Sequence, residues 1–342
     1  MYVTSSRRTM GLGLGRVSLS ICGALAGALL IAAGPAGCGG SDDALPPLLL
    51  TQSNAPAVAA EALITAGQTT AGAQVPLGGA ALTATRAVDG ASRRAAQHLM
   101  SRATGAPIAL DTMTAACAAG GTTTTESSST AATVTYNNCQ EDANTKINGT
   151  VKLTIKTSSG SSDFAFSVSV NLTVTAGKLS LSESGGYDLI FKSSSTGSEF
   201  ELTGKRLTIS VTGGTVSDKL TLSDFDIDVK ADTSGTPAEQ SETIDYDIDS
   251  SRLDGHISVM TAPAVTQLLD ATPARQFPHA GRILITGAKS SRLQITIAGD
   301  ETYVPPAGEG QVKIELDTGT GSFAAPIWVN WAMLQSLAGS AP

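Results

Sequence analysis

The sequence predicts an all-β protein: a large antiparallel meander preceded by a short Ala-rich helical segment. Two observations support this. From about residue 117 onward, apolar residues alternate with Ser, Thr, Asp or Asn in short runs separated by turn residues, as expected for strands with one buried and one wet face. Residues 44–116 are instead rich in alanine and lack this alternation. Roughly a dozen strands exceed what one flat sheet carries, so we expect a curled sheet, a half-barrel or a sandwich.

Residues 1–37 have the composition of an export signal. Arg7, Arg8 and Arg16 precede the apolar run VSLSICGALAGALLIAAG, and no acidic residue occurs before Asp42. Glycines within the run and Pro35 directly after it argue against a permanent membrane span. We therefore expect residues 1–37 to be removed.

The segment Pro35-Ala36-Gly37-Cys38 resembles the lipobox of bacterial lipoproteins, although Pro35 departs from the aliphatic residue usual there. The resemblance implies that the Cys38 thiol receives a diacylglycerol and that the amine freed by cleavage is acylated. A membrane then becomes a partner, to which the chain is anchored by acyl chains without spanning it. Gly39 stands where inner-membrane lipoproteins of enteric bacteria carry aspartate, so the resemblance implies the outer membrane of a bacterial cell envelope.

The expected mature chain is acidic. Removing the signal leaves 19 Lys and Arg against 30 Asp and Glu, a net charge of −11. That balance argues against nucleic acid, and against anionic membrane surfaces, as electrostatic partners.

We expect one domain after a lipidated tether at 38–56. An Ala-rich helical lead-in spans 57–116, where AVAAEALITA (57–66) and ASRRAAQHLMSRA (91–103) favour helix by propensity. The antiparallel β domain covers 117–262. A connecting segment at 263–280, with three prolines and one expected helical turn, leads to the C-terminal β part at 281–342. The sequence IWVNWAMLQSL predicts a final strand running into a short helix.

Two cysteines remain after Cys22 leaves with the signal and Cys38 takes the lipid. A hairpin that sets Thr122 opposite Val134 also brings Cys117 opposite Cys139. In an oxidising compartment we expect a disulfide there. The alternative is a metal site, but two thiols with no nearby histidine make a poor zinc site.

A looser resemblance extends over residues 117–334. The pieces CAAGGT, TYNNC, INGTVKLTI and the late run from HAGRILITG to VNW are similar to a group of uncharacterised β-rich proteobacterial lipoproteins. The resemblance implies an exported β-rich fold and no known activity. The loop DTGTG after Leu316 departs from the more acidic loop of that group, which weakens a calcium interpretation at Asp317.

Two runs, SDFDIDV and TIDYDID, alternate aspartate with apolar residues. The aspartates are Asp224, Asp226, Asp228, Asp245, Asp247 and Asp249. A hairpin pairing Ile227 with Tyr246 would bury the apolar side chains and line six carboxylates up on the wet face. Such a ladder is either a solvated, solubilising face or a Ca²⁺ site built from hard oxygen ligands. The alternation slips between Leu222 and Phe225, which predicts a β-bulge near Ser223 and Asp224.

No constellation supports catalysis. His98, His256 and His279 are far apart in sequence, and neither an H-x-x-H pair nor a G-x-S-x-G elbow occurs. We expect a non-enzymatic envelope lipoprotein with a structural, adhesive or surface-display role. The alternatives are a carrier that binds a hydrophobic ligand in its curled sheet, and a calcium-binding β module. A further envelope component is a candidate partner.

Overall fold

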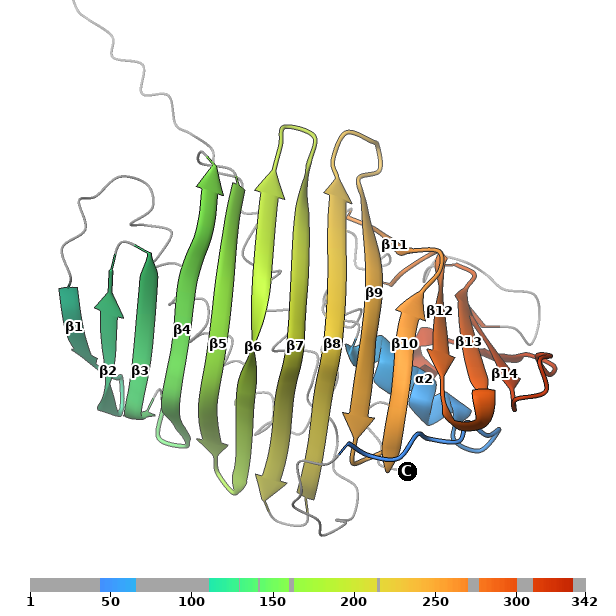
Figure 1. Ribbon diagram of the computed structural model, residues 1–342, viewed down its shortest axis with the longest axis horizontal. Coiled ribbons are helices and arrows are strands. Elements are labelled where there is room, and N and C mark those ends of the chain that lie inside the picture. Colours follow the sequence, from blue (N-terminus) through green and yellow to red (C-terminus); the bar gives the residue numbers. More distant parts are fainter. Residues whose placement is uncertain are drawn as a thin grey trace, which may run out of the picture.

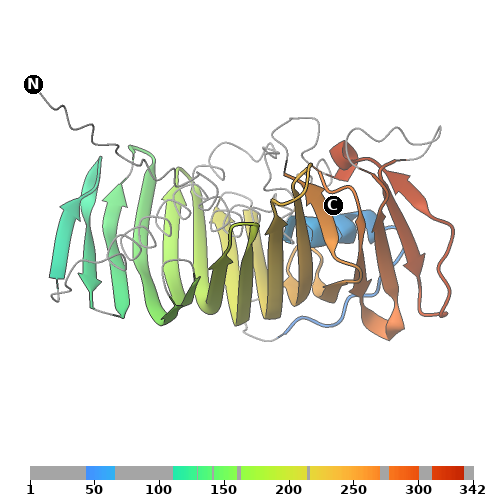
Figure 2. The same ribbon diagram turned by 90° about the horizontal axis from the view of Figure 1, so that it is seen from above.

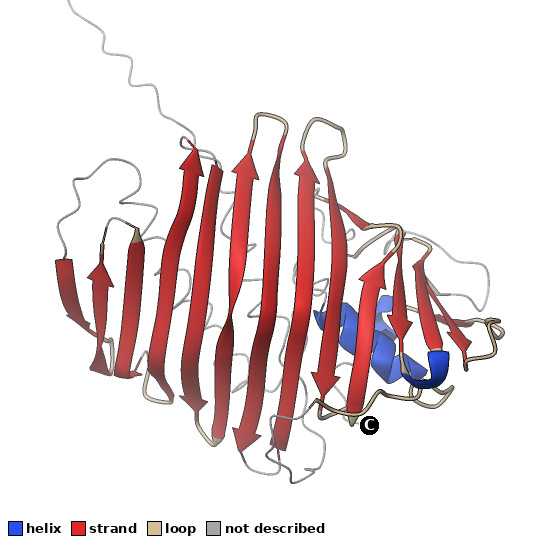
Figure 3. Cartoon of the chain, viewed as in Figure 1, coloured by secondary structure: helices blue, strands red, loops and turns tan. Residues whose placement is uncertain are grey.

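One long antiparallel sheet makes up most of the described part of this computed structural model (Figure 1), as the colouring by secondary structure in Figure 3 shows. The structure describes residues 44–65, 111–128, 130–140, 142–159, 163–213, 216–269, 277–299 and 310–334. Cys38, the export signal expected at 1–37 and the helix expected at 91–103 lie outside these residues. Within them, no helix combines the length and apolar character that crossing a membrane requires.

All fifteen strands of the described residues belong to this sheet, and fourteen of them follow a single path from β1 to β15, while β11 pairs with β9. The first strands are β1 (Asp111–Ala116), β2 (Gly120–Ser127), β3 (Ala131–Gln140), β4 (Thr145–Ser159), β5 (Asp163–Ala176), β6 (Leu179–Ser193), β7 (Gly197–Gly213) and β8 (Val216–Asp232). The others are β9 (Glu239–Ser250), β10 (Gly255–Thr261), β11 (Val265–Leu268), β12 (Gly281–Thr286), β13 (Arg292–Ile297), β14 (Val312–Asp317) and β15 (Ile327–Val329). The prediction of an all-β antiparallel meander is confirmed.

Alternation of side chains gives the sheet one apolar and one polar face. On β9, Ile244, Tyr246 and Ile248 are at most 2 % exposed, while the intervening aspartates point to the other face. The same pattern recurs on β5, where Val170 and Leu172 are buried. The apolar stripes read from the sequence therefore form the core.

The sheet is curled and open. Figure 2 shows it bowed along its length, with β12 to β14 turned around the helix α2. Its terminal strands β1 and β15 each pair with a single neighbour. Of the expected alternatives, the described strands form a curled single sheet and not a sandwich of two.

Helix α2 (Ala55–Thr65) confirms the helix expected from AVAAEALITA. Its alanines are small enough to lie close to the sheet, and Ala55, Ala59 and Ala62 are fully buried. Tyr246 of β9 donates a hydrogen bond of 3.0 Å to the Ala62 carbonyl. The helix therefore packs on the core face, where it also contacts β13 and β14.

A buried ion pair joins α2 to the turn between β9 and β10. Glu61 pairs with Arg252, and their side chains are 1 % and 3 % exposed. Ser250 at the end of β9 donates to Glu61 Oε1 at 3.1 Å. Burial lowers the pKa of Arg252 to about 10. Nothing in the sequence pattern predicted this pair.

Residues 44–50, here called the N-terminal strap, lead into α2. His256 N–H donates to the Pro46 carbonyl at 2.9 Å, and Leu48 N–H donates to the His256 carbonyl at 2.8 Å. The Leu48 carbonyl then accepts from Ala288 N–H, after the end of β12, at 2.7 Å. The strap thus bridges β10 and the β12–β13 turn through main-chain atoms.

The disulfide between Cys117 and Cys139 is present, as predicted. The register around it differs from the prediction, because Thr122 lies opposite Asn137 and not Val134. A further strand, β1, begins at Asp111 within the expected helical lead-in, so Cys117 sits at the β1–β2 turn. The sequence DTMTAA has a single large apolar side chain, Met113, so it shows no alternation that would predict a strand.

The connecting segment 263–280 also differs from the prediction. Val265–Leu268 forms the strand β11 and pairs with Glu239–Glu242 of β9 where a helical turn was expected. Residues 270–276 of this segment lie outside the described residues. At the C-terminal end, β15 is followed by a helical turn at 331–334, which confirms the strand-to-helix prediction. There Trp331 stacks on Phe277 with ring centroids 5.1 Å apart.

Candidate functional site

The acidic rows lie on the polar face of β8 and β9, but their pairing is shifted by two residues from the prediction. Asp226 lies opposite Asp245, and Asp228 lies opposite Thr243. Toward the other end of the same strands, Asp247 faces Ser223. Asp249 likewise faces Thr221. The expected ladder of six carboxylates is therefore wrong, and only Asp226 and Asp245 face one another directly.

A β-bulge separates the two halves of this register, as the slip in alternation predicted. The pairing shifts between Ser223 and Asp226. Asp224 has φ 45°, a left-handed conformation that aspartate tolerates better than most residues. Its carboxylate pairs with exposed Lys205 at 2.7 Å, and this ion pair raises the pKa of Lys205.

Gly204 of β7 provides the space that the bulge needs on the core side. A Cβ at this position would come within 2.2 Å of the Phe225 ring. Phe225 is therefore buried, while its neighbour Asp224 turns away from the aspartate row.

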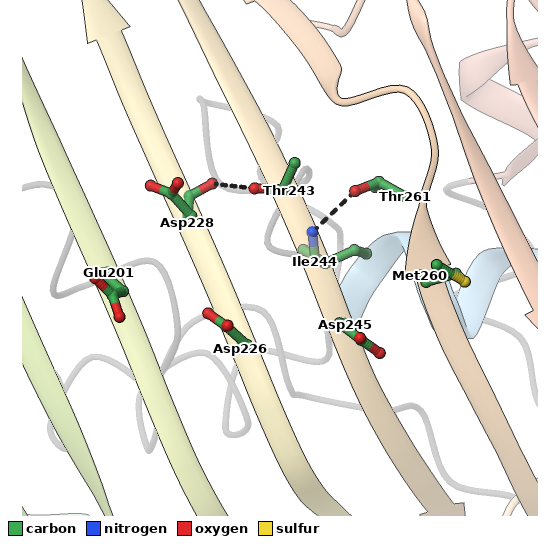
Figure 4. Close-up of a pocket in the computed structure, with 8 residues that line it drawn as sticks. All are labelled: Glu201, Asp226, Asp228, Thr243, Ile244, Asp245, Met260 and Thr261. Carbon is green, nitrogen blue, oxygen red and sulfur yellow. Dashed lines mark hydrogen bonds between the residues drawn. The ribbon is translucent and has the colours of Figure 1, made fainter.

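A groove of about 300 Å³ opens on the acidic face where β9 changes its partner strand. β10 pairs with β9 as far as Asp245, and β11 takes over from Glu242. Between them, Ile244 N–H donates to the Thr261 hydroxyl at 3.0 Å (Figure 4). The groove is lined by Glu201, Asp226, Asp228, Thr243, Ile244, Asp245, Met260 and Thr261.

The groove is rich in carboxylate oxygens, and cations only partly balance them. Glu201 lies opposite Asp228 on the adjacent strand. Asp228 pairs with Lys230 at 2.6 Å, which raises the pKa of that lysine. Among the described residues, no cation pairs with Asp226 or Asp245. The groove can therefore attract positive charge.

The geometry does not support the calcium interpretation of these aspartates. No three His, Cys, Asp or Glu side chains in the described part of the chain are grouped to hold a metal ion. The observed register explains this, because none of the three expected Asp–Asp pairs forms: Asp226 faces Asp245 instead of Asp247, and Asp228, Asp247 and Asp249 face Thr or Ser.

The carboxylate of Asp317 is also bound by groups of its own loop. Its carboxylate accepts from the N–H groups of Gly319, Thr320 and Gly321 at 2.8–3.1 Å. Arg292 binds its other oxygen at 2.7 Å. The hydrogen bond from Arg292, with those of the loop, lowers the pKa of Asp317 to about 2. The DTGTG loop thus closes on the aspartate, which leaves no calcium interpretation there.

His256 lies beside the acidic rows under the N-terminal strap. Its Nδ1 is 3.1 Å from Asp249, and its Nε2 is 3.9 Å from Asp247. The same Asp249 oxygen accepts from Leu45 N–H at 3.2 Å. This cluster holds the strap on the sheet, so we assign it a structural role. His279, which contacts Glu239 at 3.1 Å, lies elsewhere, near β11; His98 lies outside the described residues.

Two buried glutamates on the core face were missed by the sequence analysis. Burial raises the pKa of Glu183 on β6 to about 7 and that of Glu242 on β9 to about 8. Glu242 in turn contributes to the raised pKa of Tyr246. The signal was present, because Glu183 shares the parity of Leu181 and Glu242 shares that of Ile244. An acidic residue at an inward-facing position is expected to have a raised pKa, because burial disfavours the charged form of its carboxyl group.

Comparisons with protein-family models, with curated proteins and with solved structures found no match for this chain.

Proposed function

We propose that this chain is a lipid-anchored, non-catalytic lipoprotein of the bacterial envelope, held at the outer membrane. Its role is structural, adhesive or surface display: it presents the polar, acidic face of a large β-sheet from the membrane. The lipobox-like segment ending at Cys38 supports the anchor, and the fold supports the display role.

The observation that carries the display role is the burial of the apolar stripes. Ile147 of β4, Leu172 of β5 and Ile248 of β9 are at most 1 % exposed. A carrier of hydrophobic ligands needs apolar wall that a ligand can reach. These side chains serve as core, whereas the groove described above is lined largely by acidic and hydroxyl groups.

The anchor is tested by fatty-acid labelling of the full chain in a bacterial host. We expect the acyl label on the protein and its loss in Cys38→Ser. Cys22→Ser is the matched control, because it removes a cysteine of the export signal and should leave labelling intact. Labelling that survives Cys38→Ser would overturn the anchor.

The display role is tested by native mass spectrometry of residues 39–342, exported without the anchor. We expect the polypeptide mass less two hydrogen atoms, which oxidation of Cys117 and Cys139 to the disulfide removes, with nothing bound. Co-purified mass the size of a lipid would favour the hydrophobic-ligand carrier instead.

A further inference from the structure

We propose that the strand ends around the β9–β10 turn form the membrane-facing surface of the domain, with a lipid bilayer as the partner. Here this end is called the strap end, because the N-terminal strap joins the sheet there. The inference rests on the proposed lipid anchor at Cys38. It adds which part of the molecule meets the membrane.

The strap is fixed to this end by five hydrogen bonds that begin at Leu45. Leu45 N–H donates to Asp249, one residue before the end of β9. Pro46 and Leu48 pair with His256 near the start of β10. Leu48 also accepts from Ala288, and Leu50 N–H donates to the Ser291 hydroxyl at 3.1 Å. The attachment point therefore cannot slide along the sheet.

The chain between the anchor and this attachment is short. Leu45 follows Cys38 by seven residues. A fully extended chain spans at most about 3.5 Å per residue, so Leu45 lies within about 25 Å of the anchored thiol. The strap end is therefore held close to the membrane.

Strand registers identify what else lies at the strap end. Ser217, near the start of β8, lies opposite Thr212 near the end of β7, and Ser251 N–H donates to the Lys219 carbonyl. At the opposite end, Gly197 of β7 pairs with Asp232 of β8. β8 has 17 residues, which at about 3.3 Å each separates the two ends by about 55 Å. Figure 1 shows the strap crossing the sheet at the end where β9 terminates and β10 begins.

Charge favours an upright domain over one that lies on its polar face. That face carries Asp226, Asp228 and Asp245, and anionic headgroups repel it. The strap end mixes both signs. The described charges that reach solvent there include Lys146, Lys178, Lys219, Asp142 and Asp254, whereas Asp218 and Arg252 at the same end are buried. Contact through this end brings less like charge to the lipid surface.

Two serines provide matched probe positions. Ser217 lies at the strap end, and Ser195 lies in the turn between β6 and β7 at the opposite end; both are exposed. Ser217→Cys and Ser195→Cys, each in the lipidated, disulfide-bonded full chain, are labelled with the same fluorophore. The proteins are then reconstituted in phosphatidylethanolamine–phosphatidylglycerol vesicles that contain a lipid with a nitroxide headgroup.

We expect the probe at Ser217 to lose most of its emission and the probe at Ser195 to keep it. Equal quenching at both positions would show a domain that lies flat, and stronger quenching at Ser195 would show the reverse orientation; either overturns the inference. An insertion of about twenty Gly and Ser residues before Ala44 should reduce quenching at Ser217, because flexible linkers of this length reach much farther. Quenching that persists would show that the short tether does not set the orientation.

The flotation of the same samples separates this inference from the proposed anchor. If the protein neither carries acyl chains nor floats with the vesicles, both the proposed anchor and the proposed orientation are overturned. A lipidated protein that floats but is quenched equally at the two positions would remove the orientation alone.

Discussion

The two ends of the sheet are held in different ways. At the C-terminal end, β12 to β14 turn around α2, and Ile283 and Ile285 of β12 and Leu293 and Ile295 of β13 are fully buried. At the N-terminal edge, β1 has one large apolar side chain, Met113, and that side chain and its neighbours are exposed. A disulfide ties this edge to β3. At the C-terminal end, the strands carry enough apolar side chains to bury, and a helix covers them. At the N-terminal edge they do not, and a covalent bond stabilises the edge.

Breaking the ion pair under α2 should have the largest effect. Arg252→Met leaves Glu61 buried without its partner, which costs about 4 kcal/mol of unfolding free energy. The double variant Glu61→Leu with Arg252→Met should recover most of this loss, because no charge remains buried. Urea unfolding of the three proteins measures both values. Equal losses in the single and double variants would show that packing, and not charge, holds the helix.

Lys205→Met is the control for that experiment. Its partner Asp224 is 64 % exposed, and exposed pairs contribute at most about 1 kcal/mol. A loss as large as that of Arg252→Met would contradict the contrast between buried and exposed pairs.

Removing the disulfide should have the next largest effect, confined to the other end. Cys117→Ala with Cys139→Ala opens a loop of 22 residues' separation, for which about 3 kcal/mol is typical. We expect hydrogen exchange to accelerate in β1 to β3 and to stay slow in β12 and β13. Uniform acceleration across the sheet would show that the two ends unfold as one unit.

Glu183, buried on β6, should make the stability of the protein depend on pH. Its pKa is raised to about 7 from an ordinary value of 4.5. The unfolded chain therefore ionises first as pH rises, and stability falls between about pH 4.5 and pH 7. Glu183→Gln should remove a loss on the order of 2 kcal/mol across this window. Thermal melts at pH 5 and pH 8 measure it, with the exposed Glu126→Gln as control; an unchanged difference in Glu183→Gln would assign the pH dependence to other groups.

Sequence patterns predicted the features that show a regular spacing of apolar residues and the disulfide, which needs two cysteines. Alternation gave the strands and the bulge at Asp224, and alanine propensity gave α2. The register of β8 with β9 could not be predicted, because a shift of two residues leaves every side chain on the same face. The pattern therefore fits Asp226 opposite either Asp245 or Asp247. The loop between the two strands is too long for its length to fix the register.

The N-terminal strap and the groove could not be predicted from the sequence for a related reason. The strap is held largely by main-chain atoms, so Pro46 and Leu48 need no particular side chain to bond with His256. The groove arises where β9 exchanges β10 for β11, and β11 is only four residues long. Neither a main-chain hydrogen bond nor a change of partner strand requires particular residue types, so neither can be recognised in the sequence.

The smallest effect is expected on the acidic face, where Asp226 and Asp245 are directly opposed. Like charges so placed destabilise a strand pair, so Asp226→Asn should stabilise the protein by about 0.5 kcal/mol at low salt. High salt screens this repulsion, and the gain should shrink accordingly. Asp228→Asn is the comparison, because the relief of its repulsion with Glu201 opposite is offset by the loss of its ion pair with Lys230, so it should give no gain. Equal gains from the two variants would show that net charge, and not the facing pair, determines stability on this face.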